Sequence, residues 1–155
     1  MQECKLATNP ISKSITDEGS EELRDITLYR GAVGSLAFLA DTTRPDIAYA
    51  VNQLAREMRD PSTAYRQRVE QVLGYLGGTS DLCIMFNITK IVLKAYSDSD
   101  LAAHSGGKST TGWVILCNEA PFHWKTQLQR HTTLSSTEGE VVSMCALAKE
   151  VVWIR

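Results

Sequence analysis

Residues 110–127 read TTGWVILCNEAPFHWKTQ, and this stretch decides the fold class. All side chains from 113 to 117 are apolar, and in a strand Trp113, Ile115 and Cys117 would alternate with Val114 and Leu116 between the two faces. A second strand-like run, at 120–127, follows after only two residues, Asn118 and Glu119. Two such runs joined by a tight connection are typical of a β-hairpin. We therefore predict a pair of antiparallel strands here.

The segments on either side of this hairpin extend the pattern. Upstream, LCIMFN at 82–87 and IVLKAYS at 91–97 are short β-branched or aromatic runs bounded by polar residues, so we predict two further strands. Downstream, SSTE at 135–138 has the pattern of a capping box and opens a helix. The apolar side chains expected to share one face of that helix are Val141, Val142, Cys145, Ala148 and Val152. The predicted fold class is therefore α+β.

The first half of the chain has helical periodicity instead. Apolar side chains recur at helical spacing across 29–40, and TRPD at 43–46 resembles a capping box with proline in the first turn. Asp and Pro at 60–61 repeat this start signal, and Gly-Gly at 77–78 supplies a stop. We predict three helices between residues 29 and 80.

The N-terminal residues 1–28 differ from both halves. They carry six acidic and three basic side chains and few large apolar ones. Such a segment buries little apolar surface, so we predict an acidic linker or a disordered arm.

The overall composition excludes several classes of protein. The chain has 155 residues, 43% of them hydrophobic and 22% charged, with a net charge of −2. It is too short for a large multidomain enzyme and too acidic for a generally basic nucleic-acid binder. The four cysteines form no C-x-x-C pair, which argues against zinc and for reduced thiols in an intracellular protein. No apolar stretch approaches the roughly 18 residues of a membrane span, so we expect no membrane partner.

Three acidic residues are candidates for catalysis. Asp98 and Asp100 stand at the carboxyl end of the run 91–97, and Glu138 lies in the predicted helix beside the same sheet. Carboxylates so placed could bind a hard cation such as Mg²⁺, as in two-metal phosphodiester hydrolysis. Two structural roles compete with this interpretation. The two aspartates could lie in a solvated turn, and Glu138 could satisfy backbone N–H groups at the helix start.

Other motifs offer weaker signals. AAHSGGKST at 102–110 approaches the phosphate-binding loop, but it lacks the first glycine and precedes a strand rather than a helix, so we interpret it as a hairpin connection. Two groups of basic side chains could contact a nucleic-acid backbone or simply form solvated surface. They are Arg56, Arg59, Arg66 and Arg68 in the helical half, and Lys125 and Arg130 after the hairpin.

An ordered set of motifs resembles a known family. The set comprises YRGAVGSLAFLA at 29–40, TRPDIAYAVN at 43–52, VLGYLGGT at 72–79, YSDSD at 96–100, GKSTTGW at 107–113 and LSSTEGE at 134–140. Together these motifs closely resemble the end of the polymerase region and the ribonuclease H region of copia-type retrotransposon Pol polyproteins. The resemblance runs from Tyr29 to Arg155.

The resemblance implies both a fold and a chemistry. Residues 29–80 would be the helical connection after the reverse transcriptase, and 81–155 a partial ribonuclease H-like domain of antiparallel strands plus one long helix. Asp98 and Glu138 match the family's metal-binding acids, and Asp100 matches a further common acid. The implied cofactor is Mg²⁺, the implied substrate is an RNA–DNA hybrid, and the implied partner is the remainder of the Pol polyprotein. The implied location is intracellular, either cytoplasmic or nuclear.

The sequence also departs from this family. Leu101 stands where tryptophan is usual, and the family's next metal-binding aspartate lies beyond the position of Arg155. We therefore expect the parent protein to be a ribonuclease H-type endonuclease and the isolated chain to have little activity. Two alternatives stay open. The chain could be a domesticated or degenerate module that binds nucleic acid or protein and self-associates through an incomplete sheet, or a fragment that does not fold stably.

Overall fold

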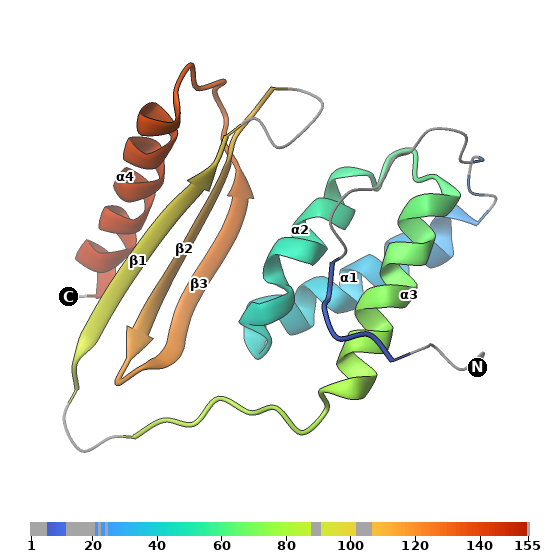
Figure 1. Cartoon of the computed structure of the whole chain (residues 1–155), viewed down its shortest axis with the longest axis horizontal. Helices are drawn as coiled ribbons and strands as arrows, with labels where there is room; N and C mark the ends of the chain where they lie inside the picture. The colour runs from blue at the N-terminus through green and yellow to red at the C-terminus, as the bar shows by residue number, and fades with distance from the viewer. Residues whose placement is uncertain are drawn as a thin grey trace. The chain divides into compact units, whose positions relative to one another are not determined.

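The computed structural model describes residues 6–11, 21, 23, 25–87, 91–101 and 107–154. The chain divides into two compact units, Met1–Cys83 and Ile84–Arg155. The first unit is helical, and the second combines an antiparallel sheet with one long helix (Figure 1). The fold class is therefore α+β. None of the described helices is long and apolar enough to cross a membrane.

The helical unit contains α1 (Ile26–Thr42), the short 3-10 helix η1 (Pro45–Ile47), α2 (Ala48–Arg56) and α3 (Thr63–Gly78). Apolar side chains from all four helices form its core. The most deeply buried of them are Val33, Leu36, Ile47, Leu54 and Val72. The Tyr29 hydroxyl enters this core and donates to the carbonyl of Leu54 at 2.8 Å. Burial raises the pKa of Tyr29, because the phenolate would lose its hydration there.

Part of the predicted acidic arm belongs to this unit. Helix α1 begins at Ile26 rather than at Tyr29, and Asp25 caps it by accepting the N–H of Leu28 at 3.0 Å. Leu23 is only 7% exposed and joins the helical core. Leu23, with Ile11 partly buried against the same core, therefore anchors this segment by apolar burial that its acidic surroundings concealed. Most of the remaining arm lies outside the described residues.

The predicted caps Thr43 and Asp60 of the helical unit are wrong, although Pro45 does begin the helical segment η1, as predicted. Thr43 ends α1, donating its N–H to the carbonyl of Leu39 at 3.0 Å, and does not cap the following helix. Asp60 does not cap α3, which begins at Thr63 after Ser62. The side chains of Arg44 and Asp46 instead contact each other and residues distant in sequence.

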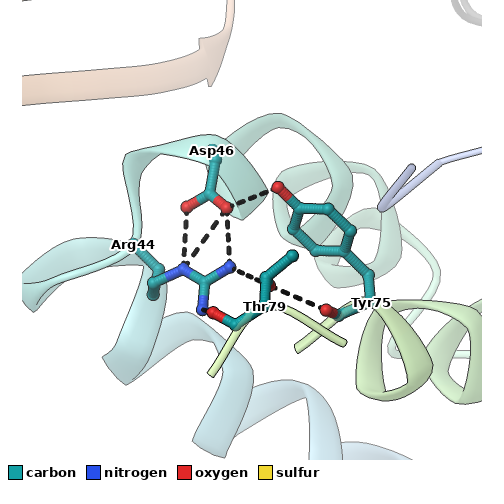
Figure 2. A network of polar contacts seen from close by, with 4 residues as sticks. All are labelled: Arg44, Asp46, Tyr75 and Thr79. Atoms are coloured by element: carbon teal, nitrogen blue, oxygen red, sulfur yellow. Dashed lines mark hydrogen bonds and ion pairs between the residues drawn. The ribbon is translucent and has the colours of Figure 1, made fainter. Parts of the chain in front are cut away.

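Figure 2 shows these contacts, which link η1 to the end of α3. Arg44 Nη2 lies 2.8 Å from Asp46 Oδ2 and 2.7 Å from Thr79 Oγ1. The Tyr75 hydroxyl donates to Asp46 Oδ2 at 2.9 Å. Partial burial opposes ionisation of Asp46, but the hydrogen bonds from Arg44 and Tyr75 and the Arg44 charge outweigh it, so the pKa of Asp46 is lowered. This network fixes the chain between α1 and α2 against α3.

The second unit contains β1 (Leu93–Asp100), β2 (Thr110–Cys117), β3 (Ala120–Leu128) and α4 (Ser136–Ile154). The strands are antiparallel in the order β1-β2-β3. The predicted hairpin is confirmed, and its turn residues Asn118 and Glu119 both have positive φ, as a tight two-residue turn requires. Helix α4 runs along one face of the sheet (Figure 1), where Trp113, Ile115 and Leu147 form the core.

Two expectations for this unit are corrected. Residues 82–87 form no strand, since their backbone enters no ladder with the three described strands. The apolar residues Val141, Val142, Cys145, Ala148 and Val152 do not face the sheet; all are exposed. The buried face of α4 instead carries Gly139, Ser143 and Leu147. The small residues Gly139 and Ser143 let α4 approach the strands closely. This close contact favours the small-residue face of α4 over the face with the larger apolar side chains.

Candidate active site

Asp98 and Asp100 lie within β1 and not in a turn. Asp98 is opposite Gly112 of β2, and Asp100 is opposite Thr110. Both side chains are exposed, and Asp98 Oδ1 accepts the N–H of Ser99 at 2.8 Å. The structure therefore excludes the solvated-turn interpretation, and strand geometry fixes both backbone positions.

The direction of these side chains follows from their neighbour. Ser99 faces α4, because a Cβ atom on Gly139 would lie 2.8 Å from Ser99 Oγ. Successive side chains of a strand point to opposite faces. Asp98 and Asp100 therefore lie on the sheet face that α4 does not cover.

Glu138 stands in the first turn of α4, next to this close contact. Its N–H donates to Ser135 Oγ at 3.1 Å, and its own Oε2 accepts the N–H of Leu134 at 2.8 Å. The predicted capping role of Glu138 is therefore present in the structure. Because Gly139 packs on Ser99, the start of α4 lies beside the end of β1 that carries Asp98.

Buried polar side chains hold α4 on the sheet at this point. Ser143 is fully buried, and its hydroxyl lies 2.6 Å from the Asp98 carbonyl and 3.3 Å from the Gly112 carbonyl. The Gln129 amide donates to Thr111 Oγ1 at 3.0 Å and to the Gly139 carbonyl at 3.1 Å. Ser143 is hydrogen-bonded to β1, and Gln129 is hydrogen-bonded to α4. These two residues therefore position the backbone that carries Asp98 and Glu138.

A second buried contact extends this polar layer. The hydroxyls of Ser109 and Thr133 share a hydrogen bond of 2.7 Å, and the N–H of Gln129 donates to the Ser109 carbonyl at 2.8 Å. Sequence reasoning missed these positioning residues. The available signal was the frequency of serine and threonine at positions where the strand and helix periods predict burial.

The described carboxylates fit Mg²⁺ in chemistry but do not form a complete site. Carboxylate oxygens are the ligands that this cation prefers. Among the described residues, however, no group of three or more His, Cys, Asp or Glu side chains is placed to hold a metal ion. Asp98, Asp100 and Glu138 are therefore candidate ligands only, and no hydrolytic step follows from them alone.

The candidate nucleic-acid-binding residues fall into both units. In the helical unit, Arg56 bonds to Asn52 Oδ1 through Nη2 at 2.7 Å, and Arg66 pairs with Glu70 at 3.3 Å. Arg68 is half-buried, and desolvation lowers the pKa of its guanidinium. The exposed members of the set are Arg59, Arg66, Lys125 and Arg130. These exposed side chains are the ones accessible to a phosphate backbone.

Comparison with known proteins identifies the family. The chain is 38% identical over 151 residues to the retrovirus-related Pol polyprotein from transposon RE2 of Arabidopsis thaliana, which is 96% of the chain and 10% of that protein. It is 35% identical over 128 residues to the Pol polyprotein from transposon TNT 1-94 of Nicotiana tabacum, covering 82% of the chain and 10% of that protein. The chain belongs to the copia-type retrotransposon Pol family. It spans about a tenth of the length of these Pol relatives.

One further relative is much shorter than a Pol polyprotein. The chain is 34% identical over 128 residues to the secreted RxLR effector protein 161 of Plasmopara viticola, covering 81% of the chain and 90% of that protein. Sequence of this Pol type thus also occurs in a protein of similar size. No family model and no solved structure matches the chain.

Proposed function

We propose that this chain is the part of a copia-type Pol protein that follows the reverse transcriptase and begins a ribonuclease H-like domain. The observation that carries the proposal is the close contact of Gly139 with Ser99. It brings the helix start that bears Glu138 to the strand end that bears Asp98, in the chain order that the family motifs imply. The parent protein would then hydrolyse the RNA strand of RNA–DNA hybrids.

In this proposal the chain supplies ligands and their support, not a whole catalytic site. Asp98 and Asp100 lie on the uncovered sheet face and Glu138 at the start of α4, so these candidates would hold Mg²⁺ together only at the end of β1, where the two sides of the sheet meet. When bound, Mg²⁺ activates water and stabilises the leaving oxygen. Ser143 and Gln129 would keep the two carboxylate-bearing elements in register. Exposed Lys125 and Arg130 would contact the hybrid backbone. The isolated chain would be inactive, since its described acids do not complete a metal site.

A hybrid-cleavage assay with Mg²⁺ tests this proposal in two proteins. The 155-residue chain should leave the RNA strand intact. A longer Pol protein that contains this chain should cleave it, and Asp98→Asn or Glu138→Gln should lower the rate about 100-fold or more, because a ligand is lost. Asp81→Asn changes an exposed carboxylate elsewhere and should leave the rate unchanged. Cleavage by the isolated chain that Asp98→Asn abolishes would contradict the proposed inactivity.

A second function is favoured by the short relative from Plasmopara viticola. Because the chain covers 90% of a protein named as a secreted effector, a non-catalytic module that binds protein rather than nucleic acid is the alternative. Fluorescence anisotropy with a labelled RNA–DNA hybrid distinguishes the two functions. Hybrid binding weakened by Lys125→Ala and Arg130→Ala supports the Pol function, whereas absence of hybrid binding by both the chain and the longer Pol protein supports the alternative.

A further inference from the structure

Residues 82–87, which follow α3, expose large apolar side chains. Leu82 is 57% exposed, Met85 80% and Phe86 50%. Neither hydrophobic core of the described residues includes a residue from this segment. Apolar side chains stabilise a fold through burial, so these three contribute little to the stability of either unit.

The backbone of this segment is also accessible. It belongs to no helix or strand, and Figure 1 shows it as an elongated, irregular stretch of chain after α3. Its two ends are held. The N–H of Leu82 donates to the Thr79 carbonyl at 3.2 Å, and the Asn118 side-chain amide donates to the Asn87 carbonyl. Between these ends, no hydrogen bond joins the backbone of residues 83–86 to another described residue.

An accessible, unpaired backbone is what an endoprotease requires of its substrate. An extended peptide is bound through main-chain hydrogen bonds, and pockets for its side chains give specificity. A helix or a paired strand must open locally before it can be bound in this way, because its backbone groups already have partners. Residues 83–86 need no such opening.

We propose that the Met85–Phe86 peptide bond is a proteolytic site for an endoprotease with an apolar pocket on each side of the bond that it cuts. The exposed side chains of Met85 and Phe86 would fill the two pockets. Water is the co-reactant. The C–N bond breaks, the hydroxyl goes to the Met85 carbonyl carbon, and the proton goes to the Phe86 nitrogen. The products are residues 1–85 and 86–155.

The position of this bond preserves both units. The boundary between them falls after Cys83, so the cut leaves the described helices α1 to α3 on one product and β1 to β3 with α4 on the other. Each hydrophobic core likewise lies within one product. Proteolysis would therefore end the covalent link between the helical unit and the unit that carries Asp98 and Glu138. The cut does not depend on metal binding by these acids.

Exposure alone does not select this bond. Leu134 is 92% exposed and also lies outside the helices and strands. Its N–H, however, donates to Glu138 Oε2 at 2.8 Å. The neighbouring Thr133 is buried, with its hydroxyl 2.7 Å from Ser109 Oγ. A protease could bind the backbone around Leu134 only by breaking these contacts.

Limited digestion of the 155-residue chain with thermolysin tests the proposal, because thermolysin selects a large apolar side chain directly after the bond that it cuts. Intact-mass spectrometry should show that Met85–Phe86 is the first bond cut within residues 25–154. Phe86→Ser should slow this cut at least about tenfold, since an apolar pocket is left unfilled. Leu134→Ser removes a more exposed apolar side chain and should not change the rate. A first cut elsewhere in residues 25–154 overturns the proposal, as does a rate that Phe86→Ser does not lower.

Ser143→Ala distinguishes cutting of the folded chain from cutting after unfolding. This substitution removes a buried hydroxyl that reaches two strand carbonyls, so it destabilises the second unit. A cut that requires unfolding becomes faster as the unfolded population grows. We expect the Met85–Phe86 bond to be cut at the same rate in Ser143→Ala and in the unmodified chain, with circular dichroism confirming that both are folded. A rate that rises as stability falls overturns the proposal, because the bond would then be protected in the folded chain.

Discussion

Ser99 and Gly139 meet where β1 passes under the start of α4, at a distance that leaves no room for a side chain at residue 139. A Cβ atom there would lie 2.8 Å from Ser99 Oγ. We predict that Gly139→Ala destabilises the second unit by about 1–3 kcal/mol through overpacking. In a Ser99→Ala background the same change should be neutral or stabilising, because the obstructing hydroxyl is gone and alanine favours the helix.

Tryptophan fluorescence during denaturant unfolding measures this effect, since all three tryptophans lie in the second unit. Gly34→Ala in α1 is the matched control. A Cβ atom at Gly34 has nothing within 4 Å, so helicity followed by circular dichroism should show a gain of about 0.5–1 kcal/mol. An equal loss from Gly139→Ala with and without the Ser99 hydroxyl would refute the steric explanation.

Ser143 gives a second prediction for the same interface. Its buried hydroxyl reaches the carbonyls of Asp98 and Gly112, so Ser143→Ala removes a donor from two adjacent strands. We expect the free energy of unfolding of the second unit to fall by about 1–2 kcal/mol. Thr137→Ala, on the exposed side of the same helix, should change it little. Equal effects of the two substitutions would mean that the Ser143 contact contributes nothing.

The cap of α4 can be separated from any metal role of Glu138. Ser135→Ala removes the acceptor for the Glu138 N–H and should cost about 1 kcal/mol in the absence of Mg²⁺. Glu138→Gln retains an acceptor for the Leu134 N–H, so it should cost less than Glu138→Ala. Glu140→Ala is the exposed control. If Glu138→Gln and Glu138→Ala have the same free energy of unfolding, the hydrogen bond from the Leu134 N–H does not contribute to stability.

The network around Asp46 predicts acid sensitivity of the helical unit. The pKa of Asp46 in the folded chain lies below its ordinary value of 3.8, so its ionised form is favoured by folding. This contribution is therefore complete above pH 3.8 and disappears as the pH falls through the lower folded value. When the pH is lowered below 3.8, helicity should fall less steeply in Asp46→Asn than in the unmodified chain. Asp41→Asn, at an exposed position of α1, should not change this acid-induced loss of helicity. An unchanged acid-induced loss of helicity in Asp46→Asn would contradict the role given to Asp46.

Tyr75→Phe tests the same network from its other side. It removes the donor to Asp46 Oδ2 but keeps the ring beside Arg44. We expect a loss of about 0.5–1.5 kcal/mol in the helical unit near neutral pH. Tyr49→Phe is the comparison, since Tyr49 is an exposed tyrosine of the same unit. A larger loss from Tyr49→Phe, measured by circular dichroism during denaturant unfolding, would argue against the role given to Tyr75.

The hairpin was predictable because its signals are local. The β-branched and aromatic residues of 110–117 and the two turn residues indicate β2, β3 and their pairing without help from the rest of the chain. The run 82–87 has similar local character and forms no strand, since a strand also needs a neighbour that sequence alone does not identify. The capping signal at Thr43 failed for a related reason. Arg44 and Asp46 are engaged by Tyr75 and Thr79, which are distant in sequence.

The candidate acids were easier to find than their surroundings. Their residue type and family motifs pointed to Asp98 and Glu138, whose roles as metal ligands stay predictions. Their environment depends on which face of α4 meets the sheet. The larger apolar side chains favoured the face of Val141 and Val152, whereas the structure buries Gly139 and Ser143. A serine in a helix ordinarily indicates surface, so its carbonyl contacts could be found only in three dimensions.

The buried polar layer beneath α4 has a consequence for alignment. An interface of apolar side chains alone would let the helix slide by a fraction of a turn with little change in energy. Here the hydrogen bonds of Ser143 and Gln129 can form at only one position of α4 along the sheet, because a shift of the helix would leave their buried donors without acceptors. The hydrogen bonds of this polar layer therefore permit only one position of α4 on the sheet. Precision in the position of Glu138 is set by hydrogen-bond direction rather than by tight packing of large side chains.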